Sequence, residues 1–178
     1  NWYGSGSSYV HADIHGLDFS PSGGNTYFAS TDGGIFKTSN ASTWTDMSGN
    51  MSIGQMYRLG CSATDPDMVI QGWQDNGTSM YNAGSWDRIM GGDGMECFID
   101  YTDNNYMYAE FYNGDLQASD NGGAWFSSIT NGLSGNAAWV TPWIMDPVDP
   151  MTLYVGYEDV FRSSNQGNSW TKISSFFG

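Results

Sequence analysis

The sequence has little positive charge. Only five of its 178 residues are Lys or Arg, against 19 Asp or Glu, and the formal net charge at pH 7 is -14. Nucleic-acid binding needs clustered Lys and Arg to neutralise phosphates, and docking on anionic membranes needs basic segments. We therefore expect neither partner. An acidic surface favours solubility and is also compatible with a divalent cation such as Ca²⁺, which prefers oxygen ligands.

Long apolar runs are missing too, so we expect no membrane insertion. No signal peptide is recognisable, and the chain begins at Asn1 rather than Met, which suggests that upstream sequence is missing or was removed. Cysteine is scarce: Cys61 and Cys97 are the only two. They could form one disulfide bridge or remain as two buried thiols, and the sequence alone leaves both open.

Amphipathic helical stretches are also lacking, whereas aromatic residues make up 16% of the chain and Gly occurs 24 times. This composition is typical of short strands joined by tight turns. Tryptophans follow polar turns at intervals of about forty residues, a period typical of β-propeller blades. These tryptophans are Trp44, Trp86, Trp125 and Trp170, and we expect each indole to pack between its blade and the next. The sequence therefore predicts an all-β protein, a β-propeller built of four-stranded antiparallel blades.

About four blades are expected within a single propeller segment, residues 1–178. Their approximate ranges are 10–48, 53–90, 94–130 and 137–174. Residues 1–9 could be the remnant of a preceding blade, and Phe176 and Phe177 could begin another. Because propellers avoid exposed sheet edges by closing a ring, we expect a section of a larger propeller. A complete four-bladed ring is the alternative.

Two of the turns before these tryptophans resemble the Asp-box, Ser-x-Asp-x-Gly-x-x-Trp, of bacterial neuraminidase repeats. The matching residues are Asp120, Gly122 and Trp125 in the third blade, and Asn165, Gly167 and Trp170 in the fourth. In such a turn the Asp or Asn accepts backbone N–H bonds, Gly takes a positive φ, and Trp packs between blades. We therefore expect these residues to be structural.

Both histidines of the chain lie close together, in the segment His11-Ala-Asp13-Ile-His15. Alternate residues of a strand point to the same face, so a strand here would bring both imidazoles and the carboxylate together. His11, Asp13 and His15 are thus candidates for a metal or polar binding site. The alternative is a structural cluster in which the Asp orients the two His side chains.

Two further polar clusters stand beside glycines, which allow close approach of a ligand to the backbone. One contains Gln74, Asp75 and Asn76, and the other contains Asp93 within residues 91–94. Part of this pattern is ordinary turn chemistry. The glycine-rich segment around Asp93 has no counterpart in the other blades, which favours a binding site there.

In this order, several of the motifs resemble the sortilin-like branch of secreted Asp-box propellers, often labelled glycosyl-hydrolase-like. They occupy residues 11–17, 32–34, 57–58, 74–78 and 91–94. The resemblance implies a multi-bladed extracellular propeller, frequently part of a large exported protein. A secreted or cell-surface location follows from it as an expectation.

For function, a sialidase is disfavoured because it needs three converging arginines and the chain has only Arg58, Arg88 and Arg162. A glycoside hydrolase of Asp-box type would use paired carboxylates. Its candidates are Asp13, Asp75 and Asp93, with Trp73 or Trp143 as sugar platforms. The preferred hypothesis is a module for protein or glycan recognition, or for self-assembly in an extracellular structure. Its candidate binding residues are the clusters above, His11, Asp13, His15, Gln74, Asp75, Asn76 and Asp93.

Overall fold

The computed structural model describes residues 10–21, 24–51 and 54–175, and the statements below concern these residues. The predicted remnant at residues 1–9 and the pair Phe176 and Phe177 lie outside them. The chain divides into two compact units, unit 1 (Asn1–Ile53) and unit 2 (Gly54–Gly178). The helical segments in the described ranges are two short 3₁₀ turns, η1 (Ser48–Asn50) and η2 (Tyr112–Gly114). None of the described helices has the length and apolar character that crossing a membrane requires.

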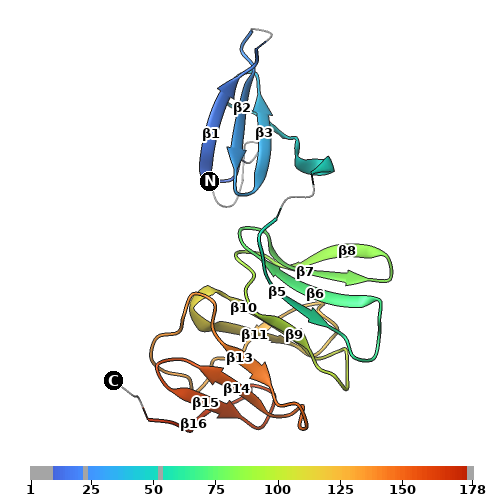
Figure 1. The fold of residues 1–178 in the computed structure, drawn as a ribbon, viewed down its shortest axis with the longest axis vertical. Helices are drawn as coiled ribbons and strands as arrows, with labels where there is room; N and C mark the ends of the chain where they lie inside the picture. Colours follow the sequence, from blue (N-terminus) through green and yellow to red (C-terminus); the bar gives the residue numbers. More distant parts are fainter. Residues whose placement is uncertain (1–9, 22–23, 52–53, 176–178) are drawn as a thin grey trace. The chain divides into compact units, whose positions relative to one another are not determined.

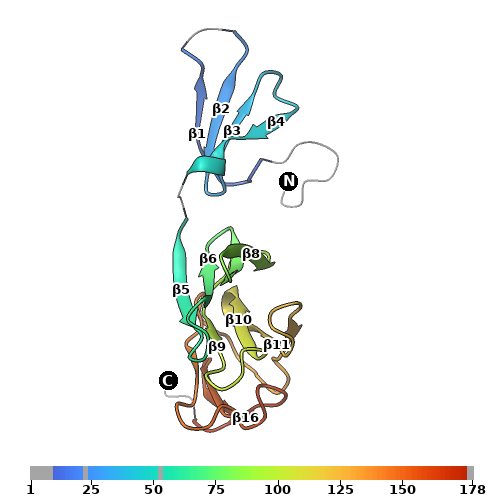
Figure 2. The ribbon, with the colours of Figure 1, turned by 90° about the vertical axis from the view of Figure 1, so that its right-hand side faces the viewer.

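The described strands form four antiparallel sheets of four strands, and in each sheet the strands follow one another in chain order (Figures 1 and 2). The sheet of unit 1 contains β1 (Ile14–Phe19), β2 (Tyr27–Thr31), β3 (Gly34–Thr38) and β4 (Trp44–Asp46). In unit 2 the second sheet contains β5 (Met56–Cys61), β6 (Met68–Trp73), β7 (Gly77–Asn82) and β8 (Ser85–Met90). The third contains β9 (Cys97–Ile99), β10 (Met107–Phe111), β11 (Asp115–Ser119) and β12 (Ser127–Ser128). The fourth contains β13 (Trp143–Met145), β14 (Leu153–Gly156), β15 (Val160–Ser163) and β16 (Thr171–Lys172).

Alternation of buried and exposed side chains explains why these segments form strands. Along β15, Phe161 and Ser163 are buried while Val160 and Arg162 are exposed. Side chains of a strand alternate between its two faces, so one face packs and the other meets solvent. The meander order of each sheet is the topology of a propeller blade.

Two hydrophobic cores hold the three sheets of unit 2 together. One lies between the second and third sheets and contains Ile70, Met90, Cys97, Ile99, Met107 and Ala109. The other joins the third and fourth sheets and contains Tyr108, Leu116, Ile129, Trp143, Leu153, Val155, Phe161 and Trp170. Because β10 contributes Met107 to one core and Tyr108 to the other, the third sheet is packed on both faces.

Close approach of the second and third sheets requires glycine. A Cβ added at Gly60 in β5 would lie 2.7 Å from the Cα of Phe98 in β9. At Gly72 in β6 it would lie 2.1 Å from the carbonyl oxygen of Met95. Both distances are shorter than any real carbon contact, so the missing side chains set the sheet spacing.

The four tryptophans that mark the repeat do not share one environment. Trp170 is buried, and its indole N–H donates to the carbonyl oxygen of Ile129 at 2.6 Å. Trp125 is 69% exposed and Trp86 is 52% exposed, and Trp44 is half-buried. The prediction that each indole packs between blades is therefore wrong for Trp86 and Trp125, although the repeat that they mark is real.

Register explains the position of Trp125. The hydroxyl of Ser163 accepts the N–H of Gly167, and the hydroxyl of Ser119 accepts the N–H of Gly123 in the same way, each at 2.9 Å. The Asn two residues after each Ser, Asn165 or Asn121, accepts further backbone N–H bonds. In the third sheet the turn is thus centred on Asn121 and not on Asp120, and it begins one residue later than the sequence analysis placed it. The position of Trp170 is accordingly taken by Phe126, which packs against the core.

The two cysteines are free. Cys97 is buried in the core between the second and third sheets, and this burial raises the pKa of its thiol to about 12. Cys61 is exposed, so the expectation of two buried thiols is wrong for it.

Candidate functional site

The loops at one end of the sheets of unit 2 gather several polar and aromatic side chains. We call this end the loop face. It consists of the β6–β7, β10–β11 and β14–β15 turns and the β8–β9 and β12–β13 connections. Hydrogen bonds between these segments show that they adjoin: the N–H of Gly94 donates to the carbonyl of Trp73, and that of Asn113 donates to the carbonyl of Trp139.

Three aromatic residues form a connected group at the loop face: two lie in its loops, and the third, Tyr57, lies near the start of β5. The rings of Tyr112 and Trp139 are stacked, with centroids 4.7 Å apart and planes 9° from parallel. The indole N–H of Trp139 donates to the hydroxyl of Tyr57 at 3.3 Å. That hydroxyl in turn donates to Oε1 of Gln74 at 2.5 Å. We call Tyr57, Tyr112 and Trp139 the aromatic platform. Tyr112 is 44% and Trp139 is 45% exposed, so the stacked pair still presents ring surface to solvent.

A buried carboxyl group holds the two loops that carry the stacked pair. Oε1 of Glu110, in β10, accepts the N–H of Gly114 at 3.2 Å and the N–H of Thr141 at 3.0 Å. Gly114 ends the turn that contains Tyr112, and Thr141 follows Trp139 by two residues. Through these two hydrogen bonds the carboxyl group of Glu110 holds both ring-bearing segments.

The environment of Glu110 is unusual for a carboxylate. The residue is fully buried, and its Oε2 has no hydrogen-bond partner among the described residues. Burial raises the pKa of this carboxyl to about 7, against the opposing effect of the hydrogen bonds from Thr141 and Gly114. Near neutral pH, Glu110 is thus divided between its neutral and charged forms.

The predicted polar residues Gln74, Asp75, Asn76 and Asp93 all lie on the loop face. Oδ1 of Asp93 accepts the N–H of Asp75 at 2.6 Å, and Asp93 is buried. Asp75 adopts a positive φ of 61° in the β6–β7 turn, and the side-chain amide of Asn76 donates to the carbonyl of Gln74. These bonds order the turn, and they place Gln74 next to Tyr57. The carboxylate of Asp93 acts here as an acceptor for the backbone.

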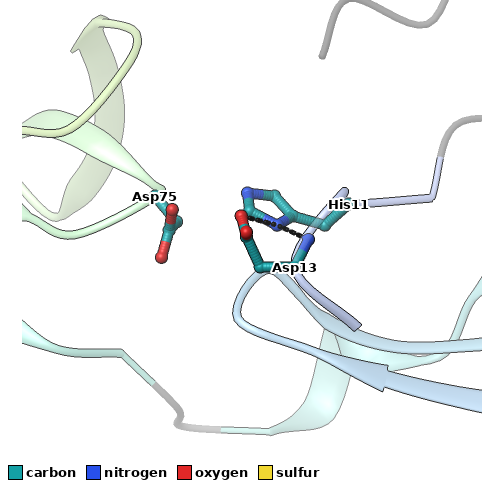
Figure 3. A group of neighbouring side chains, drawn as sticks. All are labelled: His11, Asp13 and Asp75. Carbon is teal, nitrogen blue, oxygen red and sulfur yellow. Dashed lines mark hydrogen bonds and ion pairs between the residues drawn. The ribbon is translucent and has the colours of Figure 1, made fainter. Parts of the chain in front are cut away.

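In unit 1 the structure pairs the predicted residues differently from the sequence analysis. Figure 3 shows His11 beside Asp13: Nδ1 of His11 lies 3.6 Å from Oδ2 of Asp13 and 3.5 Å from its backbone nitrogen. His15 is exposed and pairs with the carboxylate of Asp32 instead. The strand begins only at Ile14, so its alternation does not extend back to His11. A metal bound by His11, Asp13 and His15 stays a prediction.

The position of His11 depends on a glycine. A Cβ added at Gly33, in the β2–β3 turn, would lie 2.7 Å from Cδ2 of the His11 ring. The buried imidazole therefore packs over this turn. Asp32, the neighbour of Gly33, is the partner of His15, so one turn contacts both histidines.

Of the two aromatic residues proposed from the sequence as exposed sugar platforms, Trp73 and Trp143, the structure contradicts the exposure of Trp143. Trp143 is 2% exposed and belongs to the core between the third and fourth sheets, because it lies on a strand that faces that core. Trp73 is half-buried at the end of β6. Sequence reasoning identified Gln74 but missed Tyr57, Tyr112, Trp139 and Glu110. A usable signal was the aromatic residue at the turn Tyr112-Asn113-Gly114, where no core position was expected.

Comparison with known proteins gives the fold. No protein-family model matches the sequence, and no curated protein matches it significantly. Solved structures do match. An ancestral GH74 enzyme is 16% identical, with 92% of this chain and 24% of that chain covered and a TM-score of 0.59. The GH74 xyloglucanase from Xanthomonas campestris is 16% identical, with coverage of 92% and 30% and a TM-score of 0.55. An auxiliary nutrient binding protein from Bacteroides thetaiotaomicron is 10% identical, with coverage of 92% and 42% and a TM-score of 0.50.

These matches confirm the predicted class: the chain is an all-β protein whose four antiparallel sheets match part of larger β-propeller chains. The chain spans less than half the length of each of the three. At these identities the likeness shows the fold alone.

Proposed function

We propose that the protein is a recognition module that binds a glycan at the aromatic platform of unit 2. The observation that carries this proposal is the stacked, part-exposed pair of Tyr112 and Trp139, hydrogen-bonded through Tyr57 to Gln74. Aromatic rings with a polar handle suit ligands that are apolar on one side and wet on the other. A pyranose ring is such a ligand, because its C–H face stacks on a ring while its hydroxyls accept and donate hydrogen bonds.

The polar groups around the platform also suit a neutral ligand. They are the amide of Gln74, whose N–H groups can donate, and the hydroxyl of Tyr57, which can accept a further bond beside those to Trp139 and Gln74. Asp93, a predicted acidic residue of the loop face, is buried and accepts a backbone hydrogen bond. Hydroxyl-rich ligands are recognised by such uncharged groups placed around an apolar surface.

Preorganisation supports binding as well. Glu110 fixes both ring-bearing loops, and Trp139 is held by its stack and by its N–H bond to Tyr57. A side chain that is already ordered loses little conformational entropy when a ligand binds. The rings of the platform are therefore held in position before a ligand binds.

The fold is compatible with this function but does not select it. Among the matching structures, one is described as a xyloglucanase and another as a nutrient binding protein. We place the protein outside the cell or at the cell surface, in line with the resemblance to secreted propellers. A polypeptide partner or self-assembly would use the same exposed rings, since aromatic residues also anchor protein interfaces.

The test is a glycan array followed by calorimetric titration of any glycan that binds. Trp139→Ala should reduce binding by about 10-fold to 100-fold, which corresponds to the roughly 1–3 kcal/mol expected for burying an aromatic contact. Trp86→Ala is the matched control, because Trp86 is also an exposed tryptophan but lies on β8 outside the loop face. The proposal fails if no glycan binds, if both variants bind equally, or if the platform captures a protein instead.

A further inference from the structure

A cavity lies at the opposite end of the sheets of unit 2 from the loop face. It has a volume of about 300 Å³ and lies between the β11–β12 turn of the third sheet and the β15–β16 turn of the fourth. The β10–β11 turn precedes β11 and the β11–β12 turn follows it, so the two turns lie at opposite ends of this strand. The cavity is therefore distinct from the platform, which lies beside the β10–β11 turn. Its volume is at the lower end of the range for small-ligand sites.

The lining combines aromatic rings with oxygen acceptors. Its main members are Tyr106, Tyr108, Asp120, Trp125, Gln166 and Asn168. Trp125 is the most exposed tryptophan among the described residues, and its indole lines the cavity. No Lys or Arg is among the lining residues.

The polar groups that line the cavity include several oxygen acceptors. The side-chain N–H of Asn168 is already used, donating to the carbonyl of Asn165 at 2.8 Å. The carboxylate of Asp120 is exposed and leaves its oxygen atoms available to a ligand.

Negative charge is present here as well. The lining includes the carboxylate of Asp120. Since ring faces and carboxylates both attract cations, and the whole chain carries a net charge of -14, positive ligands are drawn toward this region.

The turn that forms the far wall is rigid. Gln166 adopts a positive φ of 57°, and its N–H donates to the carbonyl of Met151 at 2.9 Å. This hydrogen bond ties the β15–β16 turn to the neighbouring β13–β14 connection.

From this lining we propose that the cavity binds an organic cation, an alkylammonium head group held against Tyr106 and Trp125 with Asp120 as counter-ion. Aromatic residues that surround an ammonium group, with one carboxylate nearby, are the arrangement that recognises such ions. The head group belongs either to a free small molecule or to a trimethyl-lysine side chain of a polypeptide, because both present the same chemistry.

The experiment titrates the full chain with tetramethylammonium and choline, followed by NMR of the tryptophan indole N–H signals. The neutral isostere of choline, 3,3-dimethylbutan-1-ol, and glucose are titrated in parallel. Choline against a trimethyl-lysine peptide separates the two sources of the head group. We expect the cations to bind and to shift the Trp125 signal, and the neutral isostere to bind about tenfold more weakly or not at all.

Variants test the residues. Trp125→Ala should weaken cation binding by about tenfold, and it should fold normally because this side chain is exposed. Asp120→Asn, which keeps the shape and removes the charge, should weaken binding severalfold. Trp86→Ala and Trp139→Ala are controls that should leave cation binding unchanged, which separates this proposal from the glycan platform. The proposal is overturned if the neutral isostere binds as tightly as choline, if glucose binds best, or if Trp125→Ala has no effect.

Discussion

Replacing Glu110 by Gln should make the protein more stable at alkaline pH. The folded protein buries this carboxyl and raises its pKa from an ordinary value of 4.5 to about 7. One pKa unit corresponds to roughly 1.4 kcal/mol, so the charged form lowers the free energy of unfolding by about 3 kcal/mol.

The pH dependence has a defined direction. Below pH 4.5 the carboxyl is protonated in the folded and the unfolded state, and no stability is lost. Between 4.5 and about 7 the unfolded chain releases a proton that the folded chain keeps, so stability falls as pH rises. Above that window both states are ionised and the full destabilisation is present.

The Glu110→Gln substitution keeps the hydrogen bonds to the two loops. Its carbonyl oxygen can accept the N–H bonds of Gly114 and Thr141 as Glu110 does now, and it carries no charge at any pH. We expect the variant and the wild type to unfold at similar denaturant concentrations at about pH 5, and the variant to gain up to about 3 kcal/mol at about pH 8.5.

The assay is urea unfolding followed by tryptophan fluorescence across this pH range. Glu158→Gln is the matched control, since Glu158 is an exposed carboxylate in the β14–β15 turn of the same loop face, and its replacement should change little. The reasoning is refuted if the difference between Glu110→Gln and wild type does not grow with pH, or if the variant is less stable at alkaline pH.

Two further predictions follow from the packing of unit 2. Gly72→Ala should destabilise the protein by several kcal/mol in the same unfolding assay, because its Cβ would meet the carbonyl oxygen of Met95. The control Gly91→Ala should be tolerated, because a Cβ there would have no atom within 4 Å. Equal effects of the two substitutions would contradict the close approach of the sheets. Under native conditions a thiol reagent should alkylate the exposed Cys61 and spare the buried Cys97. Mass spectrometry of the modified peptides checks this, and rapid labelling of Cys97 would contradict its burial.

The architecture was predictable because local sequence patterns define the repeat. Turn residues and β-forming residues recur along each sheet, and four sheets with strands in chain order are found. The tryptophan spacing predicted the repeat correctly, although Trp86 and Trp125 do not pack between sheets. Trp125 and Phe126 are neighbours in sequence, and only the hydrogen-bond register of Ser119 and Asn121 shows which of the two packs inward.

The candidate site was harder to predict because long-range contacts build it. Gln74 could be selected from its local motif, yet its partner Tyr57 lies 17 residues away and Trp139 lies 82 residues from Tyr57. Glu110 reads in the sequence as an ordinary strand residue. Glu110 becomes buried only when two loops converge. The same convergence lets it accept a hydrogen bond from the N–H of Thr141.

The most direct test of the account is saturation-transfer NMR with a glycan selected on the array, using the wild type, Trp139→Ala and Trp86→Ala. The account predicts strong transfer to the ring C–H protons of the sugar in the wild type and in Trp86→Ala, and its loss in Trp139→Ala, because those protons stack on the platform. Transfer that persists in Trp139→Ala, or that disappears with Trp86→Ala, would contradict the placement of the binding site on the loop face.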